Sequence, residues 1–425
     1  MVLAISLSVS LVIPGILGPG LFGLYSLIVV WVGFLIPITS FGIGAGIMYY
    51  ISNKSYSFQS VFSTNLFIAS LIGIFNILIL CILKFTGLIN YVDNSIQSNE
   101  LFMLCGSVFF QSIIFVVGRA WLGDSKFDHL NSIDLLNSLL SPLVLLCALW
   151  YFDIRDTLFI YISYLVTSVL VFFYTGFLLR SQLEWNRLNF IYLKQIFPYG
   201  LKSWIGDVAL KANLRLDQLI LGSFYSLDAL GIYSVAVKLV ELIWLIPDTI
   251  GPVLFNRVAG NSNQNDNIRI VSRIHRLTLV TCFVILFLWI FICHQVIVPY
   301  ILGNQFIEVT SIIFLLAPGI LIVISSKLIT KLFSASGNVM WTSNITIIGS
   351  AISIILYFLF IPTLGATGAA IASTLGYISL AFAGWIVLMR NYKVHFHEFY
   401  MVKRADIIWI KELLNTFFIR KSFKP

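Results

Sequence analysis

Five cationic side chains lie within stretches that are otherwise apolar enough to cross a membrane: Lys202, Lys211, Arg215, Lys238 and Lys327. A charge that faces lipid at the bilayer centre costs roughly 2.5–3.5 kcal/mol even on the most lenient insertion scale. Several such charges in one chain therefore indicate a water-filled interior, where cations can bind an anionic group. The sequence predicts a hydrated cationic cavity within the membrane.

On one of these stretches the charges follow a helical spacing. At 100° per residue, Asp207, Lys211 and Arg215 fall within about 80° of one another, and Asp217 lies on the adjacent flank. One face of this helix is therefore expected to contact water. Intramembrane carboxylates commonly mark ion pathways, so Asp207 and Asp217 are candidates for coupling to protons or sodium ions.

The next apolar stretch carries a similar polar stripe. Lys238 and Glu241 are three residues apart, and Asp248 follows seven residues after Glu241. Glu241 is the third ion-coupling candidate. Lys202 and Asp248 lie near the ends of their spans, where a side chain can reach water at little cost, and are weaker candidates for the site.

These residues form two proposed sets of contacts. The cations expected to hold an anionic headgroup are Lys211, Arg215, Lys238 and Lys327. The candidate sugar contacts, by stacking and hydrogen bonding, are Tyr25, Trp31, Asn213 and Gln218. Two alternatives stay open. In the first, the charges serve only to pair with one another, for example Asp207 with Lys211 or Lys238 with Glu241. In the second, the aromatic and amide groups are ordinary packing residues of the bundle.

The composition places the chain among integral membrane proteins. Of its residues 59% are hydrophobic and 10% are charged, against about 25% charged in soluble domains. The net charge of +8 is distributed over short loops and the C-terminal tail, so no nucleic-acid partner is expected. The sequence has no P-loop, no G-x-S-x-G and no H-E-x-x-H, and neither an enzyme nor a metal protein is expected.

The apolar runs predict an all-α polytopic membrane protein with about 12 transmembrane helices, because only helices satisfy their own backbone groups in lipid. The expected spans are 1–16, 24–50, 61–83, 101–122, 133–152, 157–179, 197–224, 227–256, 277–300, 306–333, 339–360 and 366–389. The first run is short for a span of about 20 residues, so the sequence is expected to begin inside its first helix.

The basic residues predict the orientation. Roughly 19 of them, Arg119 among them, fall in or beside loops on one side, whereas the other side receives only Lys84 and Arg155. Both termini are therefore expected to be cytoplasmic.

The chain also repeats itself. The sequence GLYS at residues 23–26 reappears as GIYS at 231–234, and residues 102–121 match 314–333 weakly at nearly the same offset. These matches predict two pseudo-symmetric six-helix lobes around a central cavity, with coincidence between apolar helices as the alternative. The expected divisions are an N-terminal lobe at 1–180, a cytoplasmic linker at 181–196, a C-terminal lobe at 197–392, and a cytoplasmic tail at 393–425 with an interfacial amphipathic helix at 406–418.

Four motifs carry a resemblance to a known family. They are LGP at 17–19 with FGLYS at 22–26, DQLILG at 217–222, GIYS at 231–234, and IP at 361–362 followed by GATGAA at 365–370. In combination they are similar to those of O-antigen repeat-unit flippases of the bacterial polysaccharide transporter family. Its superfamily also contains multidrug extruders and peptidoglycan-precursor flippases.

The resemblance implies a function. Such a protein flips undecaprenyl-pyrophosphate-linked oligosaccharide across the bacterial inner membrane by alternating access, in O-antigen and lipopolysaccharide biosynthesis. A proton or sodium gradient would drive it without a bound cofactor, and a polysaccharide polymerase and a chain-length regulator are the candidate protein partners. The chain departs from the family pattern in its short first span and in an N-terminal lobe with almost no intramembrane charge.

Two other functions were weighed. A drug/cation antiporter of the same superfamily would favour a negative cavity, whereas five basic residues against four acids make this interior slightly positive. A polysaccharide polymerase or ligase would need catalytic residues in a large outward loop, and the predicted outward loops are short.

Overall fold

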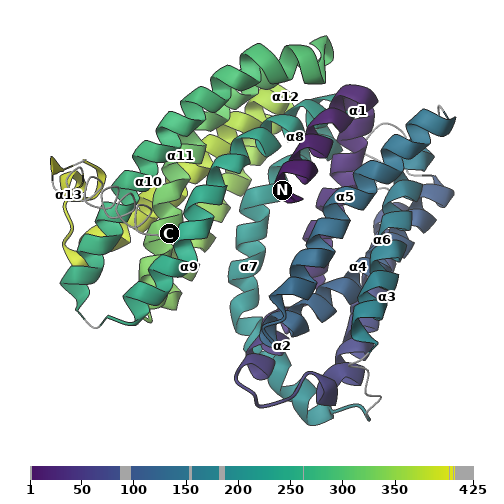
Figure 1. The fold of residues 1–425 in the computed structure, drawn as a ribbon, viewed down its shortest axis with the longest axis horizontal. Coiled ribbons are helices and arrows are strands. Elements are labelled where there is room, and N and C mark those ends of the chain that lie inside the picture. The colour runs from purple at the N-terminus through teal and green to yellow at the C-terminus, as the bar shows by residue number, and fades with distance from the viewer. Residues whose placement is uncertain are drawn as a thin grey trace, which may run out of the picture.

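The computed structural model is built from α-helices joined by short connections (Figure 1). It describes residues 2–86, 97–152, 156–180, 187–261, 263–401, 403, 404 and 406. The longer helices are α1 (Val2–Thr39), α2 (Ile43–Ser52), α3 (Phe62–Phe85), α4 (Ser98–Gly123), α5 (Phe127–Phe152), α6 (Thr157–Leu179), α7 (Phe190–Phe224), α8 (Leu227–Glu241), α9 (Leu245–Ala259), α10 (Gln264–Ile292), α11 (Val309–Ala335) and α12 (Val339–Tyr392). A π-helix, Cys293–Leu302, extends α10, and α13 (Phe396–Tyr400) lies in the tail.

Among the described residues, nine helical segments are long and apolar enough to cross a membrane. Two of them contain a break where a glycine adopts a positive φ: Gly18 divides α1, and Gly365 divides α12. A third helix, α7, is 35 residues long but carries six charged residues. Dividing α1 and α12 and counting α7 gives the twelve crossings that the sequence predicts.

The predicted boundaries need correction at three places. Residues 24–50 do not form one helix, because α1 continues to Thr39 and α2 begins at Ile43 after a left-handed Gly42. The first predicted span is continuous with the second through Gly18. The predicted linker 181–196 already contains the start of α7 at Phe190, where the side chain of Asn189 accepts a hydrogen bond from the backbone N–H of Tyr192.

Figure 1 shows two groups of helices with α7 (teal) running between them. We call α1–α6 the N-terminal lobe and α8–α12 the C-terminal lobe. Helix α7 contacts α1 and α2 on one side and α12 on the other, while α1 also contacts α8. The surface that the lobes share is therefore built mainly by α1, α7 and α8, and most of the predicted charges lie on α7 and α8.

Close helix contacts fix this arrangement, and they depend on glycine. A Cβ atom on Gly23 of α1 would collide with the backbone of Leu227, and one on Gly231 of α8 would collide with the backbone of Pro19. A second such contact lies between Gly42, just before α2, and Gly200 of α7. A Cβ atom on either residue would collide with the backbone of the other. The main chains of the two helices in each pair can approach this closely only because both residues lack a Cβ.

The tail is described only in part. Of the predicted interfacial helix at 406–418, only Asp406 lies within the described residues, and Arg155 of the outward loops also lies outside them. The described part of the tail packs α13 against α10.

Candidate functional site

A bidentate ion pair between α7 and α8 joins Arg215 to Glu241. The two guanidinium nitrogens Nη1 and Nη2 each donate to one carboxylate oxygen at 3.0 Å. The side chain of Arg215 keeps 35% of its surface exposed and that of Glu241 keeps 17%. The sequence predicted that both residues face the interior, but it offered Lys238 as the pairing partner of Glu241.

Three of the four predicted headgroup cations lie along one surface. The ammonium of Lys211 is within electrostatic range of Arg215 and of Asp207 on the same helix, and Lys238 on α8 is within range of Arg215 and Glu241. Arg215 therefore lies electrostatically between the two lysines. These like charges repel one another, so an anion placed among them would relieve that repulsion.

Lys238 belongs to α8 but reaches across to the N-terminal lobe. Its Nζ lies 4.9 Å from the centre of the Phe22 ring and 5.8 Å from that of Tyr25, and both rings are on α1. A cation over an aromatic face is attracted to the ring, and the attraction grows when water is excluded. Tyr25, a predicted sugar contact, thus lies beside a predicted headgroup cation.

Lys327 on α11 has different neighbours. Its Nζ donates to the two carboxylate oxygens of Asp248 at 2.8 and 3.0 Å and lies 4.3 Å from a Trp244 ring centre. This cation is therefore held by an exposed acid, and an ion pair within the C-terminal lobe describes it best in this conformation. Lys202 lies exposed on α7, as expected for a residue near a span end.

A cavity of about 620 Å³ opens inside the N-terminal lobe, and Lys211 reaches its wall from α7. The polar and aromatic residues that line it are Tyr25, Gln111, Phe115, Arg119, Asp134, Asn137, Ser138, Tyr164 and Lys211. They come from α1, α4, α5, α6 and α7, so the cavity faces the surface that the two lobes share. We call it the N-lobe cavity.

Two charged residues of this cavity, Arg119 and Asp134, were not predicted from the sequence to be site residues. Arg119 was attributed to the cytoplasmic loops because it lies near the end of a predicted span, and Asp134 was not considered. In the structure Arg119 interacts electrostatically with Asp134, Asp207 and Lys211. The N-terminal lobe is therefore not free of charge, which corrects the expectation.

A helical period would have revealed this wall. Lining residues 111, 115, 118, 119 and 122 share one face of α4, and 130, 133, 134, 137 and 138 share one face of α5. Gln111 donates to the Asn137 side chain at 3.1 Å and to Ser168 at 3.2 Å, and the Arg119 guanidinium lies 5.0 Å from the Phe115 ring centre. The wall thus combines a cation, amides and aromatic rings.

Among the predicted coupling acids, Asp217 is the most buried, with 2% of its surface exposed. Its carboxylate accepts hydrogen bonds from the Tyr233 hydroxyl, from the Ser373 hydroxyl at 3.0 Å and from the Gln218 backbone N–H at 2.7 Å. Tyr233 and Ser373 tie α7 to α8 and α12, whereas Gln218 follows Asp217 on α7. Asp207, by contrast, is exposed at the surface that Lys211 shares.

The remaining predicted sugar contacts lie in packed surroundings. Asn213 is fully buried and donates to the Ser353 hydroxyl at 2.7 Å, Gln218 is 5% exposed, and Trp31 packs against the main hydrophobic core. In this conformation neither buried amide reaches a cavity wall, so their contact with sugar stays a prediction. Tyr25 alone of the four lines the N-lobe cavity.

The fold is shared with known membrane transporters. A structure of the lipid II flippase MurJ in an inward closed conformation superposes with a TM-score of 0.72 at 16% identity, covering 97% of this chain and 92% of that one. An inward-facing multidrug resistance transporter of the MATE family, in the MOP superfamily, superposes with a TM-score of 0.63 at 13% identity, covering 90% and 93%. At these identities the likeness concerns the fold.

Sequence comparison reaches a relative and a family. An uncharacterised membrane protein of Methanocaldococcus jannaschii is 21% identical over 312 residues, which are 71% of this chain and 60% of that protein. The chain therefore matches less than two thirds of this relative's length. The model of the family described as polysaccharide biosynthesis protein matches residues 12–311, well over half of the sequence, and the chain accordingly belongs to that family of multi-pass membrane proteins.

Proposed function

We propose that this protein is a flippase that carries a polyprenyl-pyrophosphate-linked oligosaccharide across the membrane. The observation that carries the proposal is the meeting of Arg119 from the N-terminal lobe and Lys211 from α7 in one cavity of about 620 Å³. Two cations from different helices suit a diphosphate, whose charge is spread over several oxygens. The amide and aromatic groups of the same wall suit sugar hydroxyls and sugar ring faces.

Arg215 and Lys238 extend this cationic surface from the cavity toward the C-terminal lobe. Because Arg215 already holds Glu241, a phosphate that approached it would compete with that carboxylate. Substrate binding would then loosen a contact between α7 and α8. This exchange offers a physical link between headgroup binding and a rocking movement of the lobes, as alternating access requires.

We further propose that the carrier acts in the bacterial inner membrane with both termini in the cytoplasm and without a chemical step. The substrate would be an undecaprenyl-pyrophosphate-linked repeat unit of O-antigen or a related surface polysaccharide. A proton or sodium gradient, acting through Asp217, Asp207 or Glu241, would supply the energy. A polymerase and a chain-length regulator would receive the product.

The experiment uses a polysaccharide-producing bacterium that lacks its own flippase and carries this gene. Arg119→Ala and Lys211→Ala should each abolish surface polysaccharide while the protein stays in the membrane at its normal level. Lys194→Ala changes the same charge at an exposed position on α7 and should leave the polysaccharide unchanged. Normal polysaccharide in both cavity variants would remove the headgroup role. Resistance to cationic drugs, lost in the same variants with no change in polysaccharide, would support the antiporter instead.

A further inference from the structure

A second charged cavity, of about 620 Å³, lies between the first turns of α10 and the tail. Its charged lining consists of Arg269, Arg273, Arg276, Lys393 and Lys403 with a single acid, Asp406. The basic loops predict that this end of the molecule is cytoplasmic. We call it the tail cavity, and the flippase mechanism makes no use of it.

The tail cavity is held together by specific contacts. Arg276 donates to the two carboxylate oxygens of Asp406 from Nε at 2.7 Å and from Nη2 at 2.9 Å. Arg273 lies 3.4 Å from the same carboxylate, and the Lys403 backbone N–H donates to it at 2.9 Å. His275 stacks on Phe399 of α13 with ring centres 4.1 Å apart. The tail is thus fixed against α10, and the wall is preformed.

The charges in this wall do not balance. The single carboxylate of the lining faces five cationic side chains and forms a bidentate pair with the buried Arg276, while Arg269 also lies 3.9 Å from Asp266, which is outside the lining. The remaining positive charge is concentrated in a concave site beside a helix N-terminus, to which Asn265 belongs. Such a site attracts a phosphate, since arginine and lysine supply its donors and the helix end adds a favourable dipole.

The shape of α10 indicates which phosphate compound fits. Arg269, Ser272 and Arg276 lie on one helix face, and the next residues on that face are Val280, Phe283 and Phe287. These three apolar side chains are 47%, 59% and 68% exposed, as expected where a helix faces lipid. From Ser272 to Phe287 the helix rises about 22 Å, which is comparable to the length of an acyl chain.

We propose that the tail cavity binds the phosphate of an anionic phospholipid, whose acyl chains lie along Val280, Phe283 and Phe287 of α10. A basic pocket beside lipid-facing helices at the cytoplasmic surface is a favourable place for such a headgroup. The site is distinct from the substrate cavity, so the proposal does not depend on the transport function.

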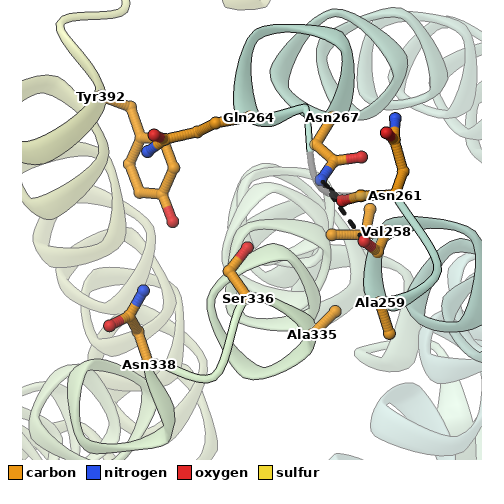
Figure 2. Close-up of a pocket in the computed structure, with 9 residues that line it drawn as sticks. All are labelled: Val258, Ala259, Asn261, Gln264, Asn267, Ala335, Ser336, Asn338 and Tyr392. Carbon is orange, nitrogen blue, oxygen red and sulfur yellow. Dashed lines mark hydrogen bonds between the residues drawn. The ribbon is translucent and has the colours of Figure 1, made fainter.

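A neighbouring cavity indicates which headgroup is preferred. This space of about 360 Å³ (Figure 2) is lined by six uncharged polar residues and three apolar ones, and it shares Tyr392 with the tail cavity. Gln264, Ser336, Asn338 and Tyr392 are among the polar residues that line it (Figure 2). Amide and hydroxyl groups there can bind the hydroxyls of a glycerol headgroup. Phosphatidylglycerol is therefore the lipid expected to bind best.

The test measures lipid binding by native mass spectrometry and by thermal stabilisation of the purified full-length protein. Phosphatidylglycerol should bind and raise the melting temperature, whereas phosphatidylcholine and inorganic phosphate should not. The double variant Arg269→Gln, Lys393→Gln removes two exposed cations that do not hold Asp406. At about 1 kcal/mol for each basic residue near an anionic lipid surface, it should weaken phosphatidylglycerol binding about 30-fold.

The matched control, Lys54→Gln with Lys194→Gln, removes two exposed cations at the same predicted side of the N-terminal lobe. This control should bind phosphatidylglycerol as the wild type does. If both double variants lost the same binding affinity, the lipid would be held only by general charge attraction, and the proposed site would be refuted. Phe283→Ala tests the contact with the acyl chain and should weaken phosphatidylglycerol binding without changing the tail cavity. Saturable binding of inorganic phosphate equal to that of the lipid would overturn the lipid assignment.

Discussion

Gly23 and Gly231 occupy equivalent positions of the internal repeat, and they pack against each other. A Cβ on Gly23 would meet the carbonyl of Leu227, four residues before Gly231, and a Cβ on Gly231 would meet the carbonyl of Pro19, four residues before Gly23. The contact is therefore the same when seen from either helix. This reciprocity is what a two-fold relation between the lobes requires.

Gly23→Ala should separate α1 from α8 and destabilise the protein by about 1–3 kcal/mol, because the added methyl group has no space. The expected result is a lower melting temperature and reduced surface polysaccharide. Gly176→Ala is the matched control, since nothing lies within 4 Å of the position of its Cβ. If the two variants melt at the same temperature, the contact does not hold the lobes.

The pair formed by Arg215 and Glu241 allows a substrate role to be separated from a structural one. Glu241→Gln should preserve much of the transport because Arg215 stays available for the headgroup, whereas Arg215→Ala should abolish it. The double variant Arg215→Ala, Glu241→Gln leaves no unpaired charge, so it should be more stable than Arg215→Ala alone but should still not transport. Transport is followed with a fluorescent polyprenyl-pyrophosphate glycan in proteoliposomes. Recovery of transport in the double variant would show that the pair serves only to hold α7 to α8.

Asp217 is the acid for which we expect an effect on ion coupling. Asp217→Asn places an amide N–H₂ where a hydroxyl or a backbone N–H now donates, so a loss of about 1–3 kcal/mol of stability is expected. Its transport should no longer respond when an ionophore collapses the proton or sodium gradient. Tyr233→Phe keeps the carboxylate, loses one donor and should still respond. A gradient response in Asp217→Asn like that of the wild type would exclude this acid from coupling.

The attachment of the tail should persist at all physiological pH values. The hydrogen bonds from Arg276 lower the pKa of Asp406 below its usual value of about 3.9. The stabilisation is therefore fully present above pH 4 and is lost as the pH falls through the lowered pKa of the folded state. Protease cleavage of the tail should be constant from pH 5 to 8 and should rise only in stronger acid. Asp406→Asn should expose the tail already at pH 7, because a buried pair that loses one partner costs about 3–5 kcal/mol.

The lengths of the apolar runs and the residues that separate them were sufficient to predict most of the fold. The predicted span 157–179 has the bounds of α6, and the twelve crossings follow from run lengths alone. The start of α7 was placed seven residues too late, although Asn189 provides a recognisable N-cap. The divisions at Gly18 and Gly365 fall at glycines with positive φ, where a sequence shows only that a bend is permitted.

The candidate site could be predicted only one helix at a time. Helical spacing places Lys211 and Arg215 on one face of α7, but it does not show which residue of α8 lies opposite. The pairing of Arg215 with Glu241 depends on the rotation and tilt of both helices. Arg119 was misplaced for a similar reason, because a cation near a span end has the same sequence pattern whether it points to water or into a cavity.

The position of Lys238 links its surroundings to the docking of the two lobes. Its exposed ammonium lies 4.9 Å from the centre of the Phe22 ring, and Phe22 immediately precedes Gly23, so the close helix contact and the ring beside this charge belong to the same turn of α1. Any movement that separates α1 from α8 at Gly23 would therefore also take this cation away from its aromatic neighbour. The charge of Lys238 would then rely more on water for its stabilisation, so the hydration of this cation depends on how tightly the two helices are packed.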